Sequence, residues 1–389
     1  MFFYLFIYFL SVCFSITFWH VFSKSQSVFQ EVREYPLPTK LFLGFISSIL
    51  IVVSCLRYGI GTDYFLYQRL FTGNTLNWEK VDARLLFKFS IDFFNRLHFP
   101  FQVFVSFFSF FSLFLLFKVI YKKSKNPFLS IAIFMGSSLY SFSLSGFRQF
   151  AAIVLVLYSS YLYTRTTENS KYNKFICLGI VIIAFSIHMT ALPAAIIFYL
   201  VYLWKPSIKT VQILCISAIP ITVITRIGLG LVNKVFILIV THSGYYSGYN
   251  NYLSNNMGLR LLSKGISLYN LILLIPLLYF IFFMLFDYVK GNYHLSSFNL
   301  FIIKISLCCE LFYSLNMSSE IINRFIMYFS ISSLFLFPEI VAYCNWKWGK
   351  RISIVTLLGV FALITFMYFR NLSSNIYDIV PYTSVFANR

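Results

Sequence analysis

Long uninterrupted apolar runs constrain this chain more than any other feature of its sequence. A helix needs about 20 residues to cross roughly 30 Å of hydrocarbon, and runs near that length recur along the whole chain. They occupy 1–22, 39–56, 98–120, 127–143, 147–163, 173–187, 190–204, 209–225, 266–287, 297–315, 321–343 and 351–369. This pattern predicts an all-α integral membrane protein, a bundle of about twelve transmembrane helices. Several middle runs are short, so the number can differ by one or two, and 227–241 is either a further span or an interfacial helix.

Composition agrees with this interpretation. Hydrophobic residues make up 59% of the 389 residues and charged residues 11%, whereas an ordinary soluble domain is roughly 45–50% apolar and about 25% charged. With 49 Phe and 28 Tyr, the surface can be solvated only if much of it faces lipid. A soluble globular fold is therefore excluded. The seven cysteines show no C-x-x-C spacing, which predicts neither a disulfide framework nor a zinc site.

Basic residues predict the orientation of the chain. The formal net charge of +19 would suggest a nucleic-acid partner in a soluble protein, but cytoplasmic loops of membrane proteins collect Lys and Arg, so we expect no nucleic acid. One alternate set of connectors is rich in basic residues: Lys24, Arg33, Lys40, Lys118, Lys122, Lys123, Lys125, Arg165, Lys171, Lys174, Lys205, Lys209, Lys290, Lys347, Lys350 and Arg351. These connectors are expected in the cytoplasm, and both termini outside.

The same assignment organises the rest of the chain. We expect a single polytopic membrane domain, 1–389, whose two long polar segments, about 57–97 and 226–264, are loops on the outer face. The polar clusters described next all fall on that face.

The first cluster follows the second span and reads R-Y-G-I-G-T-D-Y at 57–64, with Tyr67 after it. Arg57 beside two glycines suggests an anion site, because the guanidinium fork binds phosphate oxygens in pairs and glycine lets the backbone approach a ligand closely. Asp63 is a candidate base. The alternative is that Arg57 extends to lipid headgroups and Asp63 caps a short helix.

Two further candidates lie at tight turns. Arg148, in G-F-R-Q at 146–149, stands where a span begins, and an arginine at such a boundary is a functional candidate. Free N–H groups at the helix start would help it to hold a phosphate. His188 stands in the short turn before span 190–204. Imidazole is the usual general base near neutral pH, although a lone histidine is more often structural.

The last clusters lie at 318–328 and 242–252. Glu320 and Arg324 have the i, i+4 spacing that puts them on one helix face, where they form part of a site or a plain ion pair. The segment 242–252 alternates Tyr with Gly, Ser and Asn. That pattern suits the apolar faces and hydroxyl rims of sugars and equally suits an aromatic belt at the membrane interface.

Absent motifs narrow the activity. The sequence has no G-x-x-x-x-G-K-[ST], no G-x-G-x-x-G, no G-x-S-x-G and no H-E-x-x-H, so energy for a reaction must come from the substrate itself or from a gradient. Together with the tyrosines, the outer arginines Arg57, Arg148 and Arg324 suggest a substrate that carries both a diphosphate and a glycan.

At these residues the sequence resembles the EpsG-like members of the Wzy group of polysaccharide polymerases, which includes bacterial O-antigen polymerases. The resemblance rests on R-Y-G-I-G-T-D-Y-F-x-Y at 57–67, F-R-Q-x-x-A at 147–152, H-M-T-A-L at 188–192, N-R-F-x-x-Y at 323–328 and P-Y at 381–382. It covers most of the chain in the same order. It implies a multi-pass enzyme of the bacterial inner membrane with an active-site cavity that faces the periplasm.

The implied reaction moves a growing glycan from undecaprenyl diphosphate to the non-reducing end of the next lipid-linked repeat unit, with inversion as the simplest outcome. It lengthens an O-antigen or related surface polysaccharide. On this basis Arg57, Arg148 and Arg324 are expected to bind diphosphate. The catalytic candidates are Asp63, His188 and Glu320. The expected glycan contacts are Tyr64, Tyr67, Gln149, Tyr245, Tyr246, Asn323 and Tyr328.

The expected partners follow from the same resemblance. They are the undecaprenyl-diphosphate-linked oligosaccharide, membrane lipids and, by family analogy, a chain-length regulator. No metal or other cofactor is expected, because arginines can replace a divalent cation in stabilising the departing diphosphate.

Two other classes fit a chain of this kind. A flippase of lipid-linked glycans would also have about twelve spans, but its charges should follow a path near the midplane, whereas here they gather at the outer ends of spans. A membrane glycan acyltransferase would use histidine as a base, and the three arginines argue against it less strongly.

Overall fold

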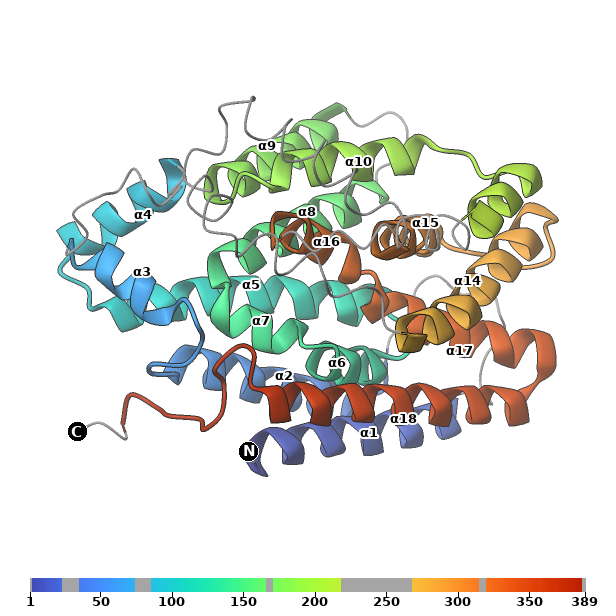
Figure 1. The fold of residues 1–389 in the computed structure, drawn as a ribbon, viewed down its shortest axis with the longest axis horizontal. Coiled ribbons are helices and arrows are strands. Elements are labelled where there is room, and N and C mark those ends of the chain that lie inside the picture. The colour runs from blue at the N-terminus through green and yellow to red at the C-terminus, as the bar shows by residue number, and fades with distance from the viewer. Residues whose placement is uncertain are drawn as a thin grey trace.

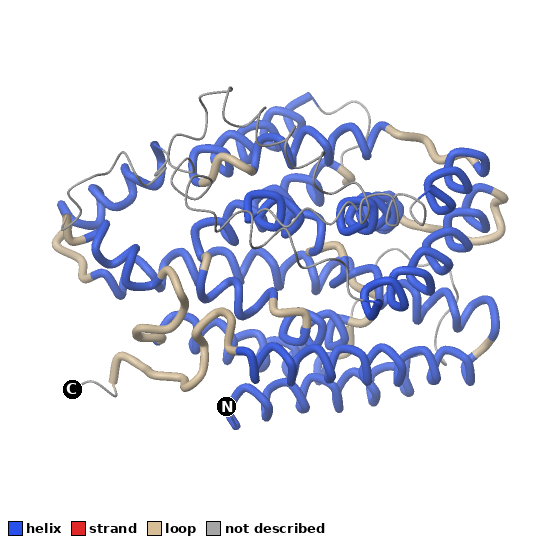
Figure 2. Tube along the Cα trace, viewed as in Figure 1, coloured by secondary structure: helices blue, strands red, loops and turns tan. Residues whose placement is uncertain are grey.

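The computed structural model describes residues 2–22, 35–73, 85–165, 171–217, 268–314 and 320–386. Within these ranges helices and their connecting loops make up the fold (Figure 2), and the β-pairing there is one isolated antiparallel bridge between Arg57 and Ser384. The predicted all-α class is confirmed for this part of the chain.

The helices follow the apolar runs closely. In chain order they are α1 (Phe2–Phe22), α2 (Leu37–Leu56), α3 (Tyr64–Phe71), α4 (Leu85–Arg96), α5 (Phe101–Lys123), α6 (Pro127–Gly136), α7 (Leu139–Ser145), α8 (Phe147–Tyr163), α9 (Lys171–Ile187), α10 (Ala191–Leu203), α14 (Leu268–Val289), α15 (Ser297–Ser314), α16 (Glu320–Ser330), α17 (Ser333–Trp348) and α18 (Lys350–Ser374).

Four stretches among the described residues are long and apolar enough to cross a membrane. They are Leu37–Leu56, Phe101–Lys123, Arg324–Trp348 and Lys350–Ser374, and the bent pair α6 and α7 would be a fifth. Shorter apolar helices occupy Tyr4–His20, Asn173–Ile187, Ala191–Leu203, Ile208–Ser217 and Ile275–Val289. The chain is therefore a membrane protein. The number of about twelve spans stays a prediction, since the run 209–225 is described only to Ser217 and 226–264 lies outside the described residues.

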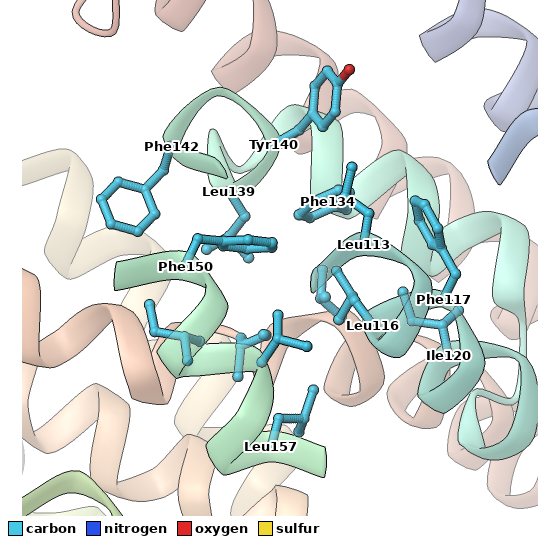
Figure 3. Close-up of a cluster of buried hydrophobic side chains, with 14 of the residues drawn as sticks. Leu113, Leu116, Phe117, Ile120, Phe134, Leu139, Tyr140, Phe142, Phe150 and Leu157 are labelled. Carbon is cyan, nitrogen blue, oxygen red and sulfur yellow. The ribbon is translucent and has the colours of Figure 1, made fainter. Parts of the chain in front are cut away.

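The core lies where α5, α6, α7 and α8 meet. Every residue of α6 and α7 is buried, and α6 packs against α1, α17 and α18, while α8 packs against α5 and α9. Figure 3 shows the interior of this region, where Phe134 of α6, Phe150 of α8 and Leu116 of α5 point toward one another. Such interlocking side chains hold helices together in lipid, where dispersion contacts rather than water exclusion drive association.

The predicted span 127–143 consists of two helices, α6 and α7, separated by a sharp bend. Asn126 starts α6 by accepting a hydrogen bond from the Leu129 amide on its side-chain oxygen, at 3.1 Å, and Pro127 suits the first helical position. The helix ends at Gly136, the connecting Ser138 has a φ of +66°, and α7 leaves at 60° to α6. The bend carries α7 toward the residues of the candidate site.

The long polar segment 57–97 also differs from the expected loop, because it contains α3 and α4. Phe87, Ile91 and Phe94 recur at helical spacing on one face of α4 and are buried, so this face docks on the protein. In Figure 1 both helices lie at one end of the long axis, and the C-terminal segment runs to the same end.

Candidate active site

The segment after α2 is held by the C-terminal segment Asn375–Val385, which we call the C-terminal strap. Arg57 pairs with Ser384 in the isolated bridge. The Tyr58 amide donates to the Thr383 carbonyl and the Val385 amide to the Leu56 carbonyl, each at 3.0 Å. The Thr383 hydroxyl also donates to the Tyr58 carbonyl, at 2.5 Å. These bonds fix the backbone on both sides of Arg57.

The Arg57 guanidinium is fully buried, with an exposed fraction of 0%. Its Nη1 donates to the Ser54 carbonyl at 2.5 Å and to the Ser109 hydroxyl at 2.7 Å, and its Cζ lies 5.6 Å from the centre of the Phe147 ring. Nε and Nη2 make no hydrogen bond to the described residues. Removal from water lowers the pKa of Arg57 to about 10, so the side chain is still charged at neutral pH.

Burial gives Arg57 a different position from the expected one. It neither extends to lipid headgroups nor reaches the surface, because Ser54 of α2, Ser109 of α5 and Phe147 of α8 enclose it. In this structure Arg57 supports the start of α8, whose second residue is Arg148.

The glycines of the first motif serve the chain's own packing. Gly61 has a φ of +101°, and a Cβ on it would stand 2.7 Å from the Leu144 carbonyl oxygen and 2.8 Å from the Ser145 Cα. The next residue, Thr62, shares a 2.5 Å hydrogen bond with the Ser145 hydroxyl. The close approach that we expected toward a ligand is made here to the end of α7.

Asp63 and Tyr64 begin α3. Asp63 is the residue before the helix, as the capping alternative expected, but its side chain makes no capping hydrogen bond. It is partly exposed, whereas Tyr64 is buried, and the Tyr64 hydroxyl donates to the side-chain oxygen of Gln102 at 3.3 Å.

Tyr67 of α3 gathers the charged residues of three motifs. It is buried, and this burial raises the pKa of its hydroxyl; the positive charges of Arg148 and Arg324 lower the pKa again, and the negative charge of Asp63 raises it. Arg148 is in hydrogen-bonding contact with the Tyr67 hydroxyl. Asp63, Arg148 and Arg324 therefore all lie within electrostatic range of this one hydroxyl.

Arg148 is supported by an aromatic ring that the sequence did not single out. Its Cζ lies 5.2 Å from the centre of the Phe87 ring on the buried face of α4, a distance at which a cation is attracted by the ring. The helical spacing of Phe87, Ile91 and Phe94 is the sequence feature that could have predicted α4. The neighbouring Gln149 reaches α16, where its amide donates to the Arg324 carbonyl at 2.6 Å.

His188 belongs to a short hydrogen-bonded chain. Its Nδ1 lies 2.7 Å from the Thr190 hydroxyl, which donates to the Tyr328 hydroxyl at 3.2 Å. A hydroxyl has one proton, and Thr190 gives it to Tyr328. This arrangement favours the neutral His188 tautomer in which Nδ1 donates to Thr190 and Nε2 accepts. Tyr328 is also within electrostatic range of Arg148. The hydrogen bonds from His188 to Tyr328 therefore end near one of the candidate arginines.

The remaining expected residues are less defined. Glu320 and Asn323 lie in α16, but their side chains are outside the described part of the structure, and Tyr245 and Tyr246 lie outside it altogether. The described residues contain no group of three or more His, Cys, Asp or Glu side chains suited to a metal ion.

Comparison with known proteins gives one match. The sequence profile described as the EpsG family matches residues 40–384, a range that contains the first motif, the three arginines and all of the C-terminal strap except its last residue. No curated protein and no solved structure matches the chain.

Proposed function

Because this chain belongs to the EpsG family, which is associated with Wzy-type polymerases, we propose that it polymerises lipid-linked oligosaccharide repeat units at the periplasmic face of the bacterial inner membrane. The donor is a growing glycan on undecaprenyl diphosphate. The acceptor is the non-reducing end of the next lipid-linked repeat, and the product is an O-antigen or related surface polysaccharide. A chain-length regulator is the proposed protein partner.

The reaction is one displacement at the anomeric carbon. A hydroxyl oxygen of the acceptor forms the new glycosidic bond, the bond from the anomeric carbon to the phosphate oxygen breaks, and the anomeric configuration inverts. The acceptor proton passes to a base, and undecaprenyl diphosphate leaves with the bonding electron pair. Negative charge grows on that diphosphate in the transition state, where positive groups stabilise it most.

The observation that carries this proposal is that Arg148 contacts the Tyr67 hydroxyl, while the neighbouring Gln149 donates to the Arg324 carbonyl at 2.6 Å and so joins the two arginine-bearing helices. Two guanidinium groups from different helices suit the two phosphates of a diphosphate. Asp63 and His188 are the proposed bases, and the hydrogen-bonded chain through Thr190 favours a His188 tautomer with an accepting Nε2. Arg57 contributes its charge from behind Phe147 and supports the start of α8.

The other residues to which we assign a role are also expected on the outer face of the membrane. Glu320 is a third candidate base, and the proposed glycan contacts are Tyr64, Tyr67, Gln149, Tyr245, Tyr246, Asn323 and Tyr328. No metal is assigned a part in the reaction, because the arginines supply the positive charge.

Surface-polysaccharide gels of cells that lack the chain test the proposal. Complementation with the unmodified protein should restore a ladder of chain lengths, whereas Arg148→Ala and Arg324→Ala should each leave single repeats, since the loss of one group that stabilises developing charge costs roughly 10²–10³ in rate. Arg370→Ala is the matched control, because Arg370 is an exposed arginine near the outer end of α18, and it should keep the ladder.

The gel also separates the other classes. Single repeats trapped on the cytoplasmic side would indicate a flippase, and a full-length but unmodified polymer would indicate an acyltransferase. An unchanged ladder in both arginine variants, with protein levels equal to the control, would refute the assignment of these arginines to the diphosphate.

A further inference from the structure

The surface of α4 is divided into three stripes. One is buried and contains Phe87, Ile91 and Phe94. A second is exposed and charged, and contains Lys88, Asp92 and Arg96. The third is exposed and apolar: Leu85 is 83% exposed, Phe89 63%, Phe93 49% and Leu97, just beyond the helix, 50%. If α4 docked on the protein through its buried stripe and met only water elsewhere, its remaining surface would be polar. The exposed apolar stripe therefore indicates a nonpolar neighbour.

The apolar stripe is connected by ring contacts to the exposed face of α5. Phe89 stacks on Phe93 at 6.5 Å between ring centres, and Phe93 meets Phe94 at 5.8 Å. Phe94 then contacts Phe107 of α5 at 5.6 Å, and Phe107 stacks on Phe111 at 6.3 Å. The rings therefore form one series from α4 onto α5.

The part of this ring series that lies on α5 indicates which medium covers the exposed apolar stripe of α4. Phe107, Phe111 and Phe114 on α5 are 50%, 41% and 50% exposed, and α5 is one of the stretches long and apolar enough to cross a membrane. Exposed phenylalanines on a spanning helix face acyl chains. Since the α4 rings continue this surface, the same medium covers them.

The charged stripe fits that placement. Lys88, Asp92 and Arg96 lie beside the apolar stripe on the exposed side of α4, as in helices that lie in the membrane interface, where the apolar face enters the acyl region and charged side chains meet headgroups and water.

We propose that α4 is an interfacial helix that lies in the outer leaflet of the bilayer, with Leu85, Phe89 and Phe93 among the acyl chains. The partner of this surface is membrane lipid, and the segment 57–97 does not project freely into the aqueous phase. The inference goes beyond the proposed reaction and does not depend on it. The buried face of α4 also carries Phe87, whose ring lies beneath Arg148. In this placement α4 separates the lipid phase from that arginine.

Spin labels on the full-length protein in lipid nanodiscs test the placement. Four single cysteines, Phe89→Cys, Phe93→Cys, Lys88→Cys and Asp92→Cys, are introduced into a variant whose seven native cysteines are replaced by serine. Labels at 89 and 93 should collide more often with oxygen, which concentrates in acyl chains, than with a water-soluble nickel chelate. Labels at 88 and 92, on the same helix, should show the opposite order.

A second measurement tests the same placement if the cysteine-free variant does not fold. The four cysteines are then placed in the native sequence, and labelling by a membrane-impermeant maleimide in open membranes is compared with the parent protein. Positions 88 and 92 should label at least several-fold faster than 89 and 93. Equal labelling, or equal access of the nickel chelate to all four positions, would overturn the proposal, and polymer formation in the same variants would report separately on the proposed reaction.

Discussion

At the scale of single residues, Gly61 lets two backbone segments meet. Its positive φ and the 2.7 Å that would separate a Cβ from the Leu144 carbonyl oxygen explain why a residue without a side chain stands between Arg57 and Asp63. The amide of Gly61 also donates to the Asp378 carbonyl of the C-terminal strap, at 3.2 Å. One glycine thus joins α7, the first motif and the strap.

Gly61→Ala should destabilise the protein more than Gly73→Ala. Both glycines have a positive φ, +101° and +74°, but a Cβ on Gly73 meets nothing within 4 Å. The unfavourable φ costs an alanine about 1–2 kcal/mol at either position, and the backbone clash at Gly61 adds about 1–3 kcal/mol. Thermal unfolding of the purified proteins in detergent measures the difference, and equal midpoints would show that α7 does not press on Gly61.

Thr190→Val should reduce polymer formation while Thr190→Ser keeps it. Valine preserves the size of the side chain but removes the hydroxyl that connects His188 to Tyr328, and a hydrogen bond worth about 1 kcal/mol corresponds to a roughly fivefold loss in rate. The measurement is incorporation of lipid-linked repeats by isolated membranes at several pH values. A pH profile and a rate that Thr190→Val leaves unchanged would show that the link from His188 to Tyr328 has no part in the reaction.

At the scale of elements, the C-terminal strap completes the segment that follows α2. Asn375 organises the strap itself, because its side-chain oxygen accepts from the Ile379 and Val380 amides at 3.0 and 3.1 Å. The strap then reaches α2 directly, where the Tyr382 hydroxyl donates to the Val53 carbonyl at 3.1 Å. Without these contacts the backbone around Arg57 would lose its partners on that side.

A stop codon after Ser374 should therefore abolish polymer formation in a protein that still inserts. The strap makes several hydrogen bonds to residues 53–61, each worth about 1 kcal/mol. A stop codon after Phe386 is the control, since it leaves the strap complete. Gels of the surface polysaccharide and immunoblots of the membrane fraction compare the two. A normal ladder from the shorter protein would show that the strap is dispensable.

The apolar runs in the sequence predicted the positions of most helices well, but they did not predict which residues those helices contact. The run 147–163 coincides with α8, and 297–315 differs from α15 by one residue, because hydrocarbon thickness sets the length of an apolar run. The helices α3 and α4 were missed since they lie in a polar segment. The enclosure of Arg57 by Ser109 and the strap joins residues far apart in the chain, and no local spacing encodes such contacts.

At the scale of the whole molecule, three of the elements around the site lie toward one end. α3, α4 and the C-terminal strap share that end of the long axis (Figure 1). The distribution of Lys and Arg predicts that this end is periplasmic.

Reporter fusions test that orientation. Alkaline phosphatase, which is active only outside the cytoplasm, should be active when fused after Arg389 and inactive when fused after Lys125, because the basic connector at 118–125 is expected in the cytoplasm. An inactive fusion after Arg389 would require an odd shift in the number of spans before the C-terminus and would place the strap on the cytoplasmic side.

The bridge between Arg57 and Ser384 also sets an order on biosynthesis. The ribosome releases the first motif early, whereas the strap is made only after every described helix has been synthesised. Chains are inserted from the N-terminus onward, so the segment around Arg57 has no strap to pair with until α18 has been synthesised. A chain that stops before the strap can occupy the membrane, but the segment around Arg57 then lacks these partners.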